Sequence, residues 1–149
     1  MTQAQASDLR VRLARPSDLE WINARYAEIR FLPSTAADLM AIGELGDQRV
    51  GIGRVVPIDA STGELGGMYV LPAFRGQGIA KAIVGFLVEH TDRTLLYCVP
   101  FASKSAIYEG LGFGRVANAC AIPAKIREKL DWCGRTHEEP VRLLEMRTR

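Results

Sequence analysis

The segment from Val70 to Ala80 constrains the fold of this chain most, because it joins a strand to a helix through a glycine turn. The first amides of a helix have no acceptor within the helix, and the helix dipole adds partial positive charge at the same end. Gly76 and Gly78 let a ligand approach the backbone closely, and Arg75 adds a full positive charge. No acidic residue occurs between positions 65 and 88. The segment therefore predicts a cradle for an anion such as a pyrophosphate.

Two other phosphate loops do not fit the sequence. A Walker loop, G-x-x-x-x-G-K-[ST], is absent. The dinucleotide fingerprint G-x-G-x-x-G fails because Lys81 stands at its third glycine. The strand expected after the helix ends in Val99-Pro100 and offers no acidic residue for a ribose. A tight turn without a ligand is the remaining alternative, and Arg75 together with the amphipathic helix that follows disfavours it.

The spacing of apolar residues predicts a mixed α/β sheet, α+β in character, with one core. A capping box at Ser17 and Glu20 indicates a first helix that ends before Pro33. Gly46-Asp47 indicates a hairpin turn. Strands are expected at 9–13, 39–44, 49–56, 64–70, 94–99, 113–117 and 141–146, and further helices at 77–90, 103–108 and 124–133. The expected order is therefore β-α-β-β-β-α-β-α-β-α-β.

Length and composition limit the organisation of the chain. Its 149 residues favour one domain over 1–149, with a loose N-terminal tail at 1–8. Nineteen basic against seventeen acidic side chains give a net charge of +2, which argues against a nucleic-acid partner or a polybasic membrane surface. No apolar run is long enough for a membrane helix, and residues 1–8 lack the apolar core of a signal peptide. We therefore expect a cytoplasmic protein.

Cysteine and histidine usage gives no sign of a metal site or a disulfide framework. Cys98, Cys120 and Cys133 form no C-x-x-C pair, and His90 and His137 form no ligand cluster with them. Cys98 falls in an expected core strand with no readable base nearby, which predicts a buried and inert thiol. No metal cofactor is expected.

Three segments in order resemble the GCN5-related N-acetyltransferase (GNAT) family. Arg75-x-x-Gly78-x-Ala80 is similar to its acetyl-CoA loop, [QR]-x-x-G-x-[GA]; the strand at 64–72 and Tyr108-Glu109-Gly110-Leu111-Gly112-Phe113 are similar to its flanking motifs. The resemblance covers residues 9–117 and the last strand. It implies a GNAT acyl-CoA N-acyltransferase fold, in which the central sheet splays open after the fourth strand and coenzyme A enters the gap. The residues expected to bind acetyl-CoA are Met68, Tyr69, Val70, Arg75, Gly76, Gln77, Gly78, Ile79, Ala80, Lys81 and Ser103.

The resemblance also implies a mechanism, in which a primary amine of a small molecule or peptide attacks acetyl-CoA directly in a ternary complex. Glu64 stands at a family-like position for the general base, the alternative being a solvated carboxylate at a strand end. Tyr108 stands at the general-acid position, the alternative being a tyrosine that packs on the sheet. A backbone amide near Val70 is expected to stabilise the oxyanion. Gly66-Gly67 permits a bulge that helps the strands to part.

Two features depart from the family pattern. Phe101 replaces an asparagine seven residues before the tyrosine, so Ser103 or Ser105 is a candidate substitute for its pantetheine contact. A helical insertion at 118–140 precedes the last strand. One hypothesis is that it shapes the acceptor pocket, with Asp131, Glu138 or Glu139 attracting a cationic amine. The alternative is a cover or a homodimer contact.

Two other functions compete with the enzyme hypothesis. A non-catalytic acyl-CoA-binding or sensor module would use the same fold, because a fold does not determine a function. Binding alone requires neither Glu64 nor Tyr108, so their presence favours the enzyme. A protein-interaction domain would leave the glycine loop unexplained.

Overall fold

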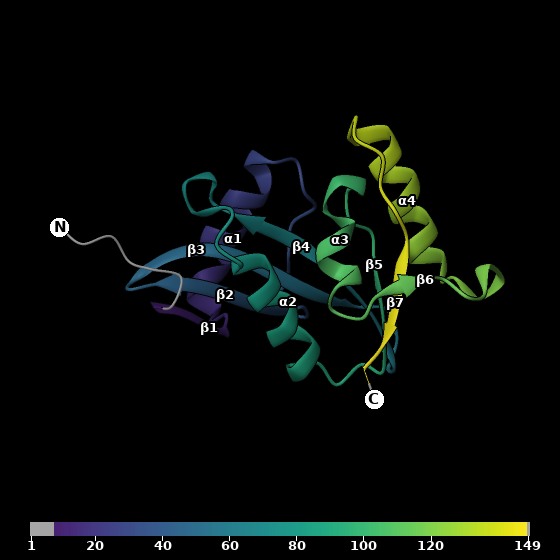
Figure 1. The fold of residues 1–149 in the computed structure, drawn as a ribbon, viewed down its shortest axis with the longest axis horizontal. Helices are drawn as coiled ribbons and strands as arrows, with labels where there is room; N and C mark the ends of the chain where they lie inside the picture. The colour runs from purple at the N-terminus through teal and green to yellow at the C-terminus, as the bar shows by residue number, and fades with distance from the viewer. Residues whose placement is uncertain (1–7, 149) are drawn as a thin grey trace.

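The computed structural model describes residues 8–148, so all but the last residue of the tail expected at 1–8 lies outside the described residues. Within them, seven strands form one sheet in the order β1-β2-β3-β4-β5-β7-β6 (Figure 1). The strands are β1 (Leu9–Leu13), β2 (Leu39–Leu45), β3 (Gln48–Pro57), β4 (Thr62–Val70), β5 (Leu95–Cys98), β6 (Gly114–Arg115) and β7 (Leu144–Arg147). The helices are α1 (Leu19–Glu28), α2 (Ile79–His90), α3 (Ser105–Glu109) and α4 (Ala124–Thr136). The expected order of elements and the mixed α/β class are confirmed.

The start of α1 differs from the capping box expected at Ser17 and Glu20. A short 3-10 turn, Pro16–Asp18, precedes the helix, and the Asp18 carboxylate accepts the backbone N–H of Arg15 at 2.7 Å. Asp18 also receives two hydrogen bonds from the Arg12 guanidinium on β1. Asp18 therefore stands at the N-cap position of α1, but its carboxylate makes no cap hydrogen bond to that helix and binds Arg12 and the Arg15 amide instead.

Helices α1 and α2 lie on opposite faces of the sheet (Figure 1). On one face, Ile22 and Tyr26 of α1 pack against Ile42 and Ile52. On the other, α2 packs Ile83 and neighbouring side chains into the larger apolar cluster. Both faces of the central strands are thus covered, which explains their nearly continuous apolar runs.

The sheet opens after the first half of β4. β4 pairs with β5 in parallel only over Thr62–Leu65, against Leu95–Cys98. Its remaining residues, up to Val70, pair with β3 alone. Because Ile52 faces Tyr69 while Arg54 faces Gly66, the register shifts by one residue on β4, which gives the bulge expected at the glycine pair. The prediction of a central sheet that splays after the fourth strand is confirmed.

The C-terminal part extends the sheet beyond β5. β7 pairs antiparallel with β5, and the two-residue β6 lies outside it. The helix expected at 124–133 continues to Thr136 as α4. β7 begins three residues later than expected, since Val141 makes only an isolated bridge to Phe101. Among residues 8–148, no helix combines the length and the apolar character that crossing a membrane requires.

Candidate active site

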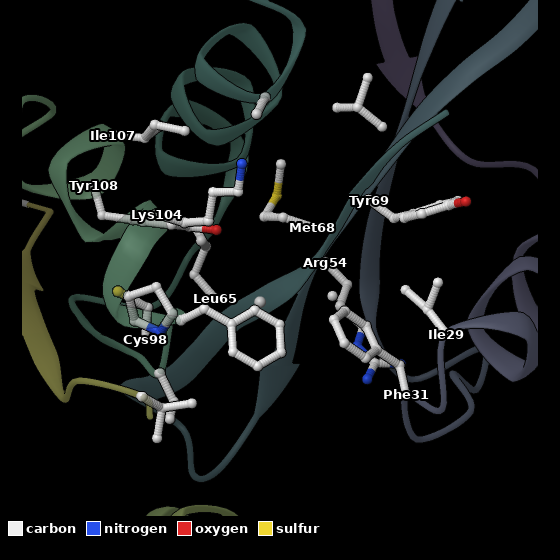
Figure 2. Close-up of a pocket in the computed structure, with 18 of the residues that line it drawn as sticks. Ile29, Phe31, Arg54, Leu65, Met68, Tyr69, Cys98, Lys104, Ile107 and Tyr108 are labelled. Carbon is white, nitrogen blue, oxygen red and sulfur yellow. The ribbon is translucent and has the colours of Figure 1, made fainter. Parts of the chain in front are cut away.

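A cavity of about 790 Å³ occupies the gap between the free half of β4 and the β5–α3 segment. The turn before α2 and the first turn of α2 line one end of it, and α4 with the segment that follows lines the other. Figure 2 shows side chains from β3, β4, β5 and α3 converging on this space. The opening of the sheet therefore creates the site.

The glycine turn presents a run of free amides to the cavity. Gly76 and Gly78 have φ values of 80° and 79°, in the left-handed region that favours glycine. The first intrahelical bond of α2 runs from the Ala82 amide to the Gly78 carbonyl at 3.1 Å. Among the described residues, the structure records no acceptor for the backbone amides of residues 76–81. These amides, together with the helix dipole, make the anion cradle that the sequence predicts.

Positive side chains surround this cradle. The Arg75 guanidinium lies 5.7 Å from the centroid of the Tyr69 ring, and its Nε donates to the Val70 carbonyl at 3.0 Å. Lys81 and Lys104 also line the cavity. Glu64 is the one acidic side chain among the described lining residues, and no acidic residue occurs between positions 65 and 88. The electrostatic field at the turn therefore favours a phosphate group.

Tyr108 on α3 directs its hydroxyl into the cavity (Figure 2). Its ring packs edge-on against Phe113 at 6.1 Å, and 7% of the residue is exposed. Burial raises the pKa of the Tyr108 hydroxyl, which therefore carries its proton at neutral pH. The structure records no hydrogen-bond partner for it within residues 8–148, so the proton is available to a bound molecule.

Glu64 lies on β4 next to the point where β4 and β5 part. Its Oε2 accepts a hydrogen bond from Lys129 Nζ at 2.9 Å, and the two side chains are 12% and 18% exposed. Lys129 belongs to α4, so the insertion expected at 118–140 reaches the candidate base directly. The structure records no donor to Glu64 Oε1 among the described residues, which leaves that oxygen for a ligand.

Most of the sequence-predicted site residues line this one cavity. They are Glu64, Met68, Tyr69, Val70, Arg75, Gly76, Gly78, Ile79, Ala80, Lys81 and Tyr108. Gln77 and Ser103 do not line it. The Ser103 amide instead donates to the Glu139 carboxylate at 2.9 Å. The Ser103 hydroxyl and this amide together lower the pKa of Glu139.

The insertion contributes different side chains from those we expected. Asp131, Glu138 and Glu139 do not line the cavity. Lys129, Trp132 and His137 do, and His137 packs edge-on against Trp132 at 5.3 Å and Phe101 at 5.2 Å. The expected acidic acceptor pocket is therefore not formed by these residues: Asp131 lies on α4 outside the lining, and Glu138 and Glu139 lie after the helix, also outside it.

Arg54 on β3 is a further lining residue that the sequence reasoning missed. It is 4% exposed, and its guanidinium lies 4.5 Å from the centroid of the Tyr26 ring. A sequence signal existed, because Arg54 is the single charged residue within the otherwise apolar or glycine run 50–56. An arginine within such a run indicates a buried cation that needs a partner, because charged side chains are rarely buried without one.

Cys98 also borders the cavity, at the end of β5. Burial and, secondarily, the nearby Glu64 raise the pKa of the Cys98 thiol, which keeps it protonated and unreactive as expected. Among residues 8–148, no group of three His, Cys, Asp or Glu side chains is placed to hold a metal ion.

Comparison with known proteins gives a consistent result. A family model described as an acetyltransferase (GNAT) domain matches residues 37–115, just over half of the chain. The chain is similar to N-acetylglutamate synthase from Neisseria gonorrhoeae, solved with coenzyme A and L-arginine, at 15% identity and a TM-score of 0.69. That match covers 93% of this chain and 33% of the other, so the chain spans about a third of the synthase.

Two similar structures are of comparable length. Rv2747 from Mycobacterium tuberculosis, in complex with CoA, is 18% identical with a TM-score of 0.71, covering 93% of this chain and 98% of the other. A GNAT acetyltransferase from Elizabethkingia anophelis with acetyl-CoA bound is 15% identical with a TM-score of 0.63, covering 94% and 98%. At these identities the likeness shows the fold.

Proposed function

The chain belongs to the GNAT acetyltransferase family, and from this premise we propose that it is an N-acetyltransferase that transfers the acetyl group of acetyl-CoA to a primary amine. One observation carries the proposal: the glycine turn with its free amides, the Tyr108 hydroxyl and the Glu64 carboxylate all border one cavity in the opened sheet. We further propose that residues 1–149 form a single GNAT domain in which 118–140 is an insertion.

Coenzyme A recognition would use the positive end of the cavity. The amides of the glycine turn suit the pyrophosphate, and Arg75 with Lys81 and Lys104 adds charge around it. The free edge of β4 at Met68, Tyr69 and Val70 offers backbone groups to the amide groups of the pantetheine arm. Open space above Gly76 and Gly78, where an added Cβ would meet no atom within 4 Å, allows the phosphates to approach the backbone.

Tyr108 is the candidate general acid. When the amine nitrogen bonds to the acetyl carbon and the carbon–sulfur bond breaks, the sulfur leaves as a thiolate that needs a proton. The buried Tyr108 hydroxyl retains its proton at neutral pH because its pKa is raised, and it has no competing partner among the described residues. These properties suit proton donation to the departing sulfur.

Glu64 is the candidate general base. Lys129 holds its Oε2, which leaves Oε1 to accept a proton from the attacking amine, directly or through one water. Lys129 thus acts as a positioning residue, because it fixes the carboxylate without contacting the reacting atoms. A carboxylate held in one rotamer loses less entropy when it engages the amine.

The proposal is tested by acetyl-CoA binding and by thiol release with a panel of primary amines. Acetyl-CoA at about 100 times its Kd should raise the free energy of unfolding by about 2.7 kcal/mol, which a thermal shift detects. Tyr108→Phe should lower kcat by about 100- to 10,000-fold while leaving the Kd for CoA unchanged. Tyr97→Phe is the matched control, because Tyr97 is equally buried but does not line the cavity.

Three results would contradict the proposal. Absence of stabilisation by any acyl-CoA would remove the coenzyme site. Stabilisation without thiol release across the whole amine panel would favour a non-catalytic acyl-CoA-binding module. Equal loss of kcat in Tyr97→Phe and Tyr108→Phe would remove Tyr108 from the chemistry.

A further inference from the structure

A patch of bare backbone separates two opposite charges at the acceptor end of the cavity. Arg54 on β3 lies directly opposite Gly66 on β4, and Glu64 is two residues from Gly66, on the same face. A Cβ added to Gly66 would lie 3.5 Å from Glu64 Oε2 and would meet no other atom within 4 Å. One added to Gly67 would run into the Tyr26 hydroxyl and lie 2.9 Å from Arg54 Nε, so these two side chains fill the space over Gly67. Gly66 therefore leaves an open floor beside the Glu64 carboxylate, and Arg54 borders that floor from the neighbouring strand.

The Arg54 guanidinium is a buried cation without a direct ion pair among the described residues. Its Nη1 donates to Ser34 Oγ at 3.1 Å, and the Ser34 hydroxyl donates to Asp38 Oδ2 at 2.6 Å, so the nearest carboxylate balances it only through Ser34. Its flat face lies on the Tyr26 ring. Figure 2 labels Arg54 and Phe31, which both line the cavity. A buried cation in this state is costly unless a ligand brings a negative group to it.

The charges that line this end disfavour a purely cationic acceptor. Glu64 is the one acidic side chain among the described lining residues, and Lys129 already neutralises it. Arg54 and Lys129 are both positive, and the acidic side chains of the insertion lie outside the lining. A molecule with a negative group at the Arg54 end and an amine at the Glu64 end fits this arrangement.

The spacing suits a small zwitterion. Arg54 and Glu64 stand in the diagonal relation of an antiparallel pair, in which the backbone positions are about 7–8 Å apart. Both side chains line the cavity, so a guanidinium and a carboxylate attached at these positions can each hydrogen-bond to one end of an α-amino acid lying between them. Phe31, Phe101 and Trp132 line the surrounding walls and offer an apolar surface to a side chain.

We propose that the acceptor is an α-amino acid or a closely related amine that carries a carboxylate, and that Arg54 binds that carboxylate beside the open floor at Gly66. This proposal rests on the proposed function. A guanidinium binds a carboxylate in a bidentate manner, which would orient the amine toward Glu64. The N-terminus of a peptide lacks an adjacent free carboxylate and would bind more weakly.

The test is calorimetric titration of the CoA-saturated protein with matched ligands. The probes are phenylalanine, phenylalaninamide and phenethylamine, and leucine, leucinamide and isoamylamine. Each free amino acid should bind about 10- to 100-fold more tightly than its amide or decarboxylated partner, since a charged hydrogen-bonded pair is lost in both. Arg54→Gln should reduce that preference to within about threefold.

Arg54→Lys and Arg49→Gln complete the design. Arg54→Lys keeps the positive charge but loses the planar guanidinium that can hydrogen-bond to both carboxylate oxygens. Part of the preference for the free amino acid should therefore survive, which would show that the loss in Arg54→Gln is not a folding defect. Arg49 lies on the same strand, pairs with Asp18 and does not line the cavity, so Arg49→Gln should keep the full preference. An unchanged Kd for CoA in every variant shows that each one is folded.

Three results overturn the inference. The first is equal or tighter binding of the decarboxylated amines. The second is no amino-acid binding up to about 10 mM, which is ten times the upper end of ordinary KM values. The third is equal loss of preference in Arg54→Gln and Arg49→Gln. Failure of the proposed function would appear separately, as absent acetyl-CoA stabilisation or absent thiol release. The binding preference is measured without turnover, so the two failures are distinguishable.

Discussion

At the residue scale, Gly78 shows how one backbone conformation creates the coenzyme cradle. It precedes α2 with a φ of 79°, where an L-residue is strained, yet a Cβ there would meet no atom within 4 Å. The requirement is therefore conformational and not steric. The left-handed turn directs the following amides toward the cavity. A residue with a side chain would be strained in this conformation.

We predict opposite effects for two glycine-to-alanine changes. Gly78→Ala should lower the free energy of unfolding by about 1–2 kcal/mol and weaken acetyl-CoA binding. Gly85→Ala, in the interior of α2 with equally open space at its Cβ, should raise the free energy of unfolding by up to about 1 kcal/mol and leave binding unchanged. Urea unfolding and calorimetric titration measure both. A Gly78→Ala protein as stable as wild type would refute the strain argument.

At the element scale, α4 joins the C-terminal part of the fold to the reacting groups. Ile126 and Cys133 are the buried residues of the helix, Lys129 reaches Glu64, and Trp132 lines the cavity. Asp131 is exposed and lies outside the lining. The helix therefore presents a packing stripe and a site-facing stripe, with its acidic residues directed elsewhere.

This arrangement predicts that α4 affects the acceptor and not the coenzyme. Trp132→Ala should raise the KM for the acceptor by about tenfold, because a large apolar wall is removed, while the Kd for CoA stays unchanged. Asp131→Ala, the matched change on the neighbouring residue, should leave both constants unaltered. Steady-state thiol release and calorimetry provide the measurements. A parallel loss of CoA affinity in Trp132→Ala would assign α4 a general structural role instead.

At the scale of the whole molecule, Asp18 ties together the elements of the N-terminal half. Its buried carboxylate receives hydrogen bonds from Arg12 on β1, from Arg49 on β3 and from the Arg15 amide before α1. The Arg12 hydrogen bonds outweigh burial and, with the other contacts, lower the pKa of Asp18 from 3.8 to about 2. Arg12 also pairs with Glu44 on β2, so one network connects three strands and a helix.

The lowered pKa predicts an acid-dependent loss of stability. A carboxyl whose pKa is lower in the folded than in the unfolded chain stabilises the fold fully above the unfolded value, near 4. That contribution, about 2 kcal/mol for this shift, should be lost as the pH falls from about 4 to 2. Asp18→Asn should remove it at pH 7 and flatten the profile below pH 4. Urea unfolding from pH 7 to 2 measures both.

The exposed residue Asp131 supplies a control for the acid profile. Asp131→Asn should change the free energy of unfolding by no more than about 0.5 kcal/mol and leave the profile unaltered. A wild-type slope that persists in Asp18→Asn between pH 4 and 2 would show that other carboxyls dominate acid unfolding.

The sequence predicted the elements well where local signals were strong. The alternation at 9–13, the Gly46-Asp47 turn and the apolar spacing of 79–90 each depend on residues within one element, and each was confirmed. The predictions from sequence were wrong where residues of other elements decide the local structure. Asp18 and not Ser17 stands at the N-cap position of α1, and the Asp18 carboxylate binds Arg12 of β1 instead of capping the helix. β7 begins late because Val141 meets only Phe101.

The residues of the candidate site also divide into those that local sequence predicts and those that it does not. The glycine turn, with Arg75 and the first turn of α2, is contiguous in the sequence, so its anion-binding character can be read from residue types and their order. Tyr108 and Glu64 required a family pattern, and the structure brings both to the cavity. The run around Arg54 indicated a buried cation but not this cavity, and Lys129 carried no local signal for either.

What the sequence by itself determined is therefore the class of fold, the order of its elements and the loop that suits a phosphate, since these follow from short-range periodicity, glycine conformation and helix-end chemistry. Only the tertiary structure decided what faces the acceptor. The contact between Glu64 and Lys129 spans 65 positions, and that between Arg54 and Gly66 depends on strand register. Such contacts exist only once the sheet has formed and opened, because no local pattern determines which distant side chains will share a cavity.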